Sequence, residues 1–174
     1  MRSIETLSTA ALLSATVLGF LGPASPARAK TPEDVAINGT YRATSIGNRA
    51  KINEQYNNEA TVISTWTISS SCTTVLECTG TVTSDQGWSA PTYTHDGTLW
   101  YVKHDVPHWE KCPDGTAFTG QQTFDFYAVE GSTGYPQIGS TVMAGSDRTV
   151  GPSGACGQNK WLSVELPFRL DKIG

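Results

Sequence analysis

The 174-residue sequence lacks the features that mark several large classes of protein. It contains no G-x-S-x-G elbow of the serine hydrolases, no phosphate-binding loop and no dinucleotide-binding fingerprint. After residue 29 there is no long apolar run that could span a bilayer. Basic residues form no cluster, although nucleic acids and anionic lipids require clustered Lys and Arg. These absences argue against a serine hydrolase, a nucleotide enzyme, a nucleic-acid binder and a mature chain with a transmembrane segment.

Residues 1–29 have the pattern of a signal peptide. Arg2 gives a positive start, and the apolar stretch 10–21 that follows is shorter than the ~20 residues of a membrane-spanning helix. The sequence Ala27-Arg28-Ala29 then fits a small-x-small cleavage site. We therefore expect an exported protein that is secreted, extracellular or held in the cell envelope.

The remaining chain suits one acidic domain. Cleavage would remove two of 12 basic residues and one of 16 acidic ones, which leaves 10 and 15 and a net charge of −5. Residues 30–38 form a polar lead-in, and residues 39–174 have the length of a single domain. Their modest aliphatic content indicates a core that depends on aromatic residues and crosslinks.

This domain shows strand patterning and almost no helical periodicity. In the clearest strand, Ser64, Trp66 and Ile68 share one face and alternate with Thr65 and Thr67 on the other. Eight such runs, separated by Gly, Asn, Asp and Pro, cover residues 39–47, 60–72, 78–85, 88–96, 98–106, 122–131, 140–151 and 160–173. The pattern predicts an all-β fold, an antiparallel meander of about eight strands, with a barrel preferred over a sandwich. Pro167 in the last run suits an edge strand or a bulge.

Four cysteines follow the predicted signal peptide, and export favours their oxidation. Three pairings are possible. A short hairpin brings Cys72 and Cys78 within the ~5.5 Å between Cα atoms that a disulfide needs. Cys112 and Cys156 would then close a longer loop, and we favour this pairing. The spacings do not match zinc knuckles, and no metal or cofactor is predicted.

Several aromatic residues are candidates for a ligand-binding surface. Trp66 and Trp100 lie on predicted strands and also suit a packed core. Trp88 follows a Gln-Gly turn and is less obviously internal. The residues predicted to line a ligand cavity are Trp66, Trp88, Tyr93 and Trp100.

The densest polar segment spans residues 103–115 and yields two alternative functions. His104 and His108 have the spacing of a helical metal pair, but Pro107 lies between them and zinc would need a third ligand. We favour a solvated loop after a hairpin strand, held by Cys112, as the explanation of this segment. The alternatives are an exported metal-dependent hydrolase that uses His104 and His108, and a protease inhibitor that presents the disulfide-braced loop 107–121. No catalytic residue is assigned.

Several strings resemble a known group of proteins. They are GTYRAT from Gly39, W-T-I-S-S-S-C-x5-C-T-G-T-V-T-S from Trp66, GWS from Gly87, DGTLW from Asp96 and CPDG from Cys112. Together they resemble small exported cysteine-containing β proteins of actinobacteria, especially mycobacteria, and extracellular regions of membrane Ser/Thr kinases. The resemblance spans roughly residues 39–120. It implies an extracellular location and disulfides, and it supplies no active site.

These observations favour a secreted, non-enzymatic β domain. An eight-stranded barrel can hold one small ligand in its interior. The expected partner is therefore a small apolar ligand or a protein of the cell envelope.

Overall fold

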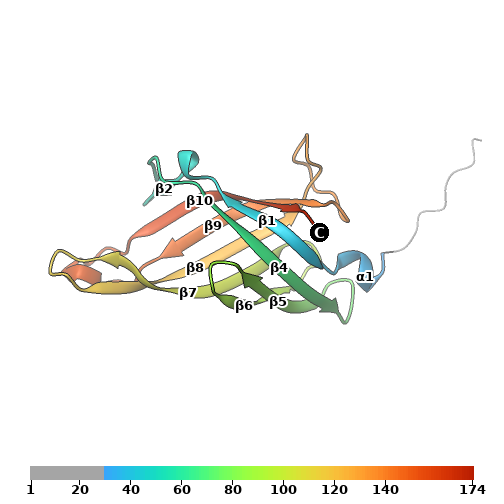
Figure 1. Cartoon of the computed structure of the whole chain (residues 1–174), viewed down its shortest axis with the longest axis horizontal. Coiled ribbons are helices and arrows are strands. Elements are labelled where there is room, and N and C mark those ends of the chain that lie inside the picture. Colours follow the sequence, from blue (N-terminus) through green and yellow to red (C-terminus); the bar gives the residue numbers. More distant parts are fainter. Residues whose placement is uncertain (1–29) are drawn as a thin grey trace, which may run out of the picture.

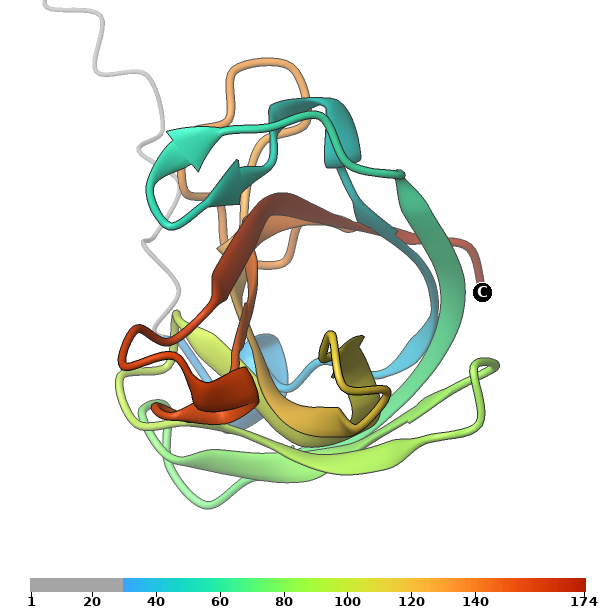
Figure 2. The ribbon, with the colours of Figure 1, turned by 90° about the vertical axis from the view of Figure 1, so that its left-hand side faces the viewer.

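Residues 30–174 are described by the computed structural model, and the signal peptide predicted over residues 1–29 lies outside them. In the described part, eight long antiparallel strands form one sheet that closes on itself, because β1 pairs with both β4 and β10. The eight strands are β1 (Gly39–Ser45), β4 (Val62–Cys72), β5 (Cys78–Ser84), β6 (Ser89–Thr94), β7 (Trp100–Lys111), β8 (Ala117–Ala128), β9 (Val142–Val150) and β10 (Ser163–Lys172). Figure 1 shows the barrel from the side and Figure 2 from one end. The predicted all-β meander and the barrel are confirmed.

Five short elements complete the described chain. Helix α1 (Pro32–Val35) precedes the barrel, and the 3-10 turns η1 (Gly47–Arg49) and η2 (Ala155–Gly157) lie in connections. The strands β2 (Lys51–Ile52) and β3 (Gln55–Tyr56) form a small hairpin on the edge of β10. The sequence analysis did not find this hairpin, because two-residue strands carry no alternation.

Alternation along each strand places apolar side chains inside the barrel, as predicted for β4. Trp66 occupies the centre, with its ring centroid 4.8 Å from that of Phe124 and 5.1 Å from that of Phe168. Phe126 and Leu170 are fully buried beside them. The rings of Trp66 and Phe124 are perpendicular, and an edge-to-face contact of this kind stabilises beyond simple burial. The middle of the barrel is therefore filled by side chains.

Pro167 lies inside a strand that is paired on both sides, so its predicted edge position is wrong. Its carbonyl accepts a hydrogen bond from the backbone N–H of Ile46, just past the last β1 residue, Ser45. On this side of β10, pairing with β1 ends at Phe168 and pairing with β2 begins at Glu165. The missing N–H of Pro167 therefore falls in a gap between two partners, where no ladder bond is lost.

Both predicted disulfides are present, Cys72–Cys78 and Cys112–Cys156. The second joins the connection between β9 and β10 to a hairpin arm, residues 107–121, that extends β7 and β8 beyond the barrel (Figure 1). The prediction of a loop over residues 107–121 is wrong for most of that length, because β7 and β8 resume pairing at Glu110 and Phe118 after a bulge.

Aromatic rings packed on glycines explain why the arm is ordered. The Trp109 ring lies so close to Gly120 that a Cβ there would meet it at 2.6 Å, and the Phe118 ring would meet a Cβ on Gly151 at 2.5 Å. The two rings themselves stand edge-to-face, with centroids 5.9 Å apart. The arm thus has a small apolar cluster of its own.

Candidate ligand pocket under helix α1

A hollow of about 320 Å³ opens at one end of the barrel. Figure 1 shows that α1, the β4–β5 turn, the β6–β7 turn and the β8–β9 connection lie at this end. We call it the helix-capped pocket. It is lined by residues 34–38, Tyr41, Gly97, Thr98, Trp100, Tyr127, Ala128, residues 136–141, Met143 and Lys172. Most of this lining is apolar.

Three inward-facing strand residues form the floor of the helix-capped pocket. Tyr41, Trp100 and Met143 come from β1, β7 and β9 and are buried. The Tyr41 hydroxyl donates to the carbonyl of Asn38 at 3.3 Å, and burial raises the pKa of this phenol. Lys172 Nζ lies 6.0 Å from the centre of the Tyr41 ring, within cation–π range. The floor separates the hollow from the filled interior.

The lead-in predicted over residues 30–38 folds against the barrel and forms one wall. Thr31 is the N-cap of α1. Its backbone N–H donates to the Asp34 carboxylate at 2.8 Å, and its hydroxyl donates to the same oxygen at 3.0 Å. Val35 then buries its side chain in the core. The Ser70 hydroxyl on β4 accepts from the N–H of Ile37 at 2.9 Å and donates to its carbonyl at 2.8 Å. These bonds fix the wall in place.

The β8–β9 connection, residues 129–141, forms the opposite wall. One carboxylate oxygen of Glu130 accepts from the Ser132 hydroxyl and from the N–H groups of Ser132 and Thr133. These bonds lower the pKa of Glu130 to about 2. The N–H of Gln137 donates to the carbonyl of Ala128 at 2.9 Å, which brings residues 136–141 back over the pocket.

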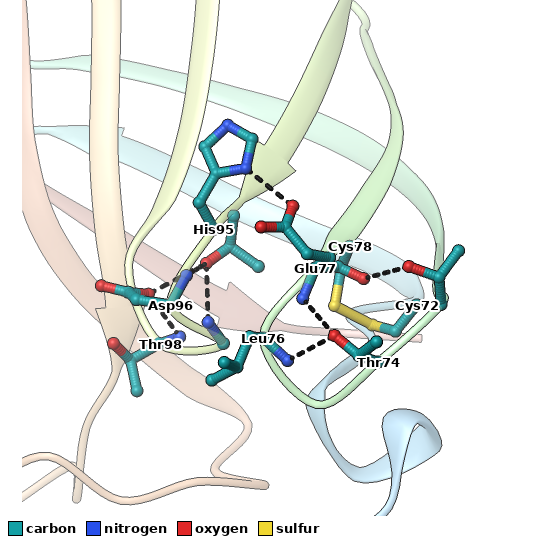
Figure 3. Close-up of polar contacts among 11 residues, drawn as sticks. Cys72, Thr74, Leu76, Glu77, Cys78, His95, Asp96 and Thr98 are labelled. Carbon is teal, nitrogen blue, oxygen red and sulfur yellow. Dashed lines mark hydrogen bonds and ion pairs between the residues drawn. A yellow bond between two sulfur atoms is a disulfide. The ribbon is translucent and has the colours of Figure 1, made fainter.

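Two turns packed on each other complete the rim, and Figure 3 shows their polar contacts. In the β6–β7 turn, Asp96 Oδ1 accepts from the N–H groups of Thr98 and Leu99, both at 2.8 Å. Burial raises the pKa of Asp96, but these bonds and those from the hydroxyl groups of Thr98 and Thr94 outweigh it and lower the pKa to about 2. This turn carries Thr98 and Gly97 into the lining.

The β4–β5 turn supports the β6–β7 turn from outside. His95 Nδ1 lies 2.8 Å from Glu77 Oε2 (Figure 3). Gly97 has a positive φ of 68°, and a Cβ there would meet the carbonyl oxygen of Val75 at 2.0 Å, so the two backbones touch. The Cys72–Cys78 disulfide closes the base of the supporting turn. The rim is therefore braced by a covalent bond, an ion pair and backbone packing.

The four predicted ligand-binding residues occupy different environments. Trp100 lies in the floor of the helix-capped pocket, and Trp66 is enclosed in the core. Trp88 stacks on His104 with ring centroids 4.1 Å apart, nearer the other end of the barrel. Tyr93 points outward and stacks on Tyr101 at 5.6 Å. The structure thus brings one of the four to this pocket.

Other lining residues were missed by the sequence analysis. Tyr41 and Met143 are each near the end of a strand, and the alternation of their strands places them inside. Their depth within the barrel, however, depends on strand register, which the pattern does not give. The α1 wall had a visible signal, because Thr31 and Asp34 have the spacing of a capping box after which Val35 supplies an apolar anchor.

The two histidines proposed for metal binding do not converge. The His104 ring stacks on Trp88, whereas His108 is exposed at the β7 bulge with a positive φ of 53°. Across residues 30–174, no group of three or more His, Cys, Asp or Glu side chains is arranged to hold a metal ion. No helix in that same range combines the length and apolar character that a bilayer crossing requires.

Comparison with known proteins relates the fold to a sensor domain. No protein-family model matches the chain, and neither does any curated protein. Among solved structures, the chain is similar to the monomer form of the M. tuberculosis PknI sensor domain, with a TM-score of 0.55 over 80% of this chain and 88% of that one. The sequences are 14% identical, so the likeness concerns the fold. The resemblance to kinase extracellular regions is confirmed at this level, while an actinobacterial origin stays a prediction.

Proposed function

We propose that this chain is an exported, non-enzymatic binding domain that takes up a small apolar ligand in the helix-capped pocket. The observation that carries the proposal is a mainly apolar hollow of about 320 Å³ above a floor formed by the buried side chains of Tyr41, Trp100 and Met143. Small-molecule sites begin at about 300 Å³. A short alkyl chain or a single ring system fits this size, and Lys172 at the rim supplies one cationic partner for a polar end group.

Two further observations support an extracellular role. Both disulfides favour an oxidising compartment, and the similar solved structure is a sensor domain. Cleavage after Ala29 and secretion belong to the proposal. Intact mass measurement of the protein recovered from culture medium tests them, with a chain that begins at Lys30 as the expected result.

Ligand uptake is tested with octanoate and 1-octanol, titrated by calorimetry into the purified chain. The key variant is Ile138→Arg, since Ile138 lines the pocket on an exposed loop where a charge does not threaten folding. We expect it to weaken the binding of the neutral probe, 1-octanol, by about tenfold or more. The matched control is Tyr135→Arg on the same loop, which is exposed and outside the lining. If neither probe binds, or both variants bind as the parent does, the proposal is wrong.

A second candidate is recognition of a protein partner by the hairpin arm. The arm projects from the barrel, and Cys112–Cys156 braces it. Its tip is also ordered, since the Asp114 carboxylate accepts from the N–H and the hydroxyl of Thr116 at 2.9 and 2.7 Å. This shape fits a protease inhibitor or an envelope-protein ligand. Incubation with a protease panel separates inhibition from simple cleavage of the tip.

A further inference from the structure

The barrel interior becomes polar toward the end that carries β2 and the hairpin arm, where Ser45, Asp147 and Thr149 are buried. This end faces the viewer in Figure 2. Asp147 on β9 is the central group there, with only 3% of its surface exposed. Ser45 Oγ donates to one carboxylate oxygen at 2.6 Å, and Gln122 Nε2 donates to the other at 2.7 Å. A carboxylate has therefore been taken from water and given two neutral hydrogen-bond donors.

No cation is paired with this carboxylate in the described structure. His104 lies near enough to affect Asp147 electrostatically, but its ring stacks on Trp88 and it shares no hydrogen bond or ion pair with Asp147. Burial raises the pKa of Asp147, and the bonds from Ser45 and Gln122, together with His104, offset only part of that rise. A buried anion in this situation is stabilised by any cation that reaches it.

A second hollow, of about 310 Å³, leads to Asp147, and we call it the carboxylate pocket. Its walls come from separate segments and include the apolar side chains Ile52, Val62, Trp109, Leu162, Val164 and Leu166. Glu59 and Glu110 add two further carboxylates to the lining. None of the described residues that line it is Lys, Arg or His; the basic residues Arg49 and Lys51 line a separate hollow.

We propose that the carboxylate pocket binds a small organic cation, with its ammonium group on Asp147 and its apolar body against the surrounding walls. Charge complementarity selects this occupant, because three carboxylates in the lining repel an anion and a neutral alcohol leaves the buried charge uncompensated. Trp109 adds an aromatic face, the kind of surface on which ammonium groups bind. The site differs in position and in ligand class from the helix-capped pocket.

Three probes of equal chain length test the proposal: hexylamine, 1-hexanol and hexanoate, titrated by calorimetry into the purified full-length chain. We expect hexylamine to bind about tenfold or more tightly than 1-hexanol, and hexanoate to bind weakest of the three. Asp147→Asn keeps the shape of the side chain and removes its charge, and should abolish the preference for the amine. Equal binding of the amine and the alcohol, or an unchanged preference in Asp147→Asn, overturns the proposal.

A second pair of variants keeps the test decisive if Asp147→Asn does not fold. Val62 lines the pocket at an exposed position, and its neighbour Ile63 is exposed on the opposite face of β4. Val62→Arg should weaken hexylamine binding by about tenfold, whereas Ile63→Arg should leave it unchanged. An equal response of both variants contradicts the assigned position. Ile138→Arg at the other end should not alter amine binding, so the proposals for the two pockets are tested independently.

Discussion

The two ends of the barrel hold hollows of nearly equal volume and mainly apolar lining, but the groups at their base differ in kind. Tyr41, Trp100 and Met143 form the floor of the helix-capped pocket, whereas Asp147 and Gln122 lie at the base of the carboxylate pocket. Both floors are made of inward-facing residues of one closed sheet, and β9 contributes to both, with Met143 at one end and Asp147 at the other. The difference therefore arises from which residues occupy a few inward positions of the sheet, and it needs no change in the fold.

The filled middle of the barrel allows this difference. Trp66, Phe124 and Phe168 pack against each other across the interior and leave no continuous channel between the ends. Burial of these rings supplies much of the stability, since a large aromatic side chain typically removes about 150–250 Å² of surface from water. A scaffold stabilised at its centre can tolerate a hollow and a costly polar group at its ends.

Each end also has its own disulfide, and their removal gives the largest expected difference between the ends. Cys112 and Cys156 are 44 residues apart in sequence, and Cys72 and Cys78 are six apart. Because a longer loop loses more freedom when closed, Cys112→Ala with Cys156→Ala should cost about 4 kcal/mol and Cys72→Ala with Cys78→Ala about 2 kcal/mol. Urea unfolding followed by circular dichroism measures both.

Reduction of the parent protein with dithiothreitol is the control, and its loss should match the sum of the two double variants if the crosslinks act independently. Equal losses, or a larger loss for the short loop, would show that native contacts around each bridge outweigh the chain entropy of the unfolded state.

The sequence predicted the barrel well, because the alternation of apolar and polar residues along a strand indicates directly which face is buried. It placed Trp66 with Ser64 and Ile68 on one face of a strand, and the structure shows this face to be internal. The long β7 and β8 extensions were missed, because Pro107 and polar residues there resemble a loop. Their pairing depends on rings packed on distant glycines, and sequence pattern does not reveal such contacts.

The candidate sites were harder to predict than the fold. Tyr93 seemed a better cavity residue than its neighbours, yet Thr92 and Thr94 face inward and Tyr93 faces outward. Large rings on β4, β8 and β10 fill the space in front of β6, which leaves room there only for small side chains. Asp147 was missed for a related reason, because its partners Ser45 and Gln122 are 102 and 25 residues away in sequence.

The pH dependence of stability should have opposite signs at the two ends. Asp147 has a raised pKa, so its stabilising contribution is complete below its ordinary value of 3.8 and is lost as the pH rises through the folded-state pKa. Asp96 has a pKa lowered to about 2, so its contribution is present above 3.8 and is lost as the pH falls toward 2. Relative to the parent, the free energy of unfolding of Asp147→Asn should therefore increase between pH 3 and about pH 7. That of Asp96→Asn should decrease over the same range.

Comparison of each variant with the parent cancels the titration of all other groups. Urea titrations at pH 3, 5 and about 7 give the required differences. The Asp96 effect should be the smaller one, at about 1 kcal/mol or less, because this carboxylate is exposed and solvent screens its interactions. If the free energies of unfolding of the two variants, relative to the parent, change in the same direction with pH, they contradict the assignment of a buried carboxylate to Asp147 and a solvated one to Asp96.

The smallest expected effect concerns the ion pair on the rim of the helix-capped pocket. The side chains of His95 and Glu77 are 68% and 52% exposed, and exposed pairs contribute about 0–1 kcal/mol. His95→Ala should therefore change the free energy of unfolding by less than about 1 kcal/mol and leave octanoate binding unaltered. Loss of the Cys72–Cys78 bridge should weaken octanoate binding, since it releases the backbone that supports Gly97. If His95→Ala weakens octanoate binding as much as loss of the bridge does, the ion pair supports the rim as strongly as the covalent bond, and this prediction is wrong.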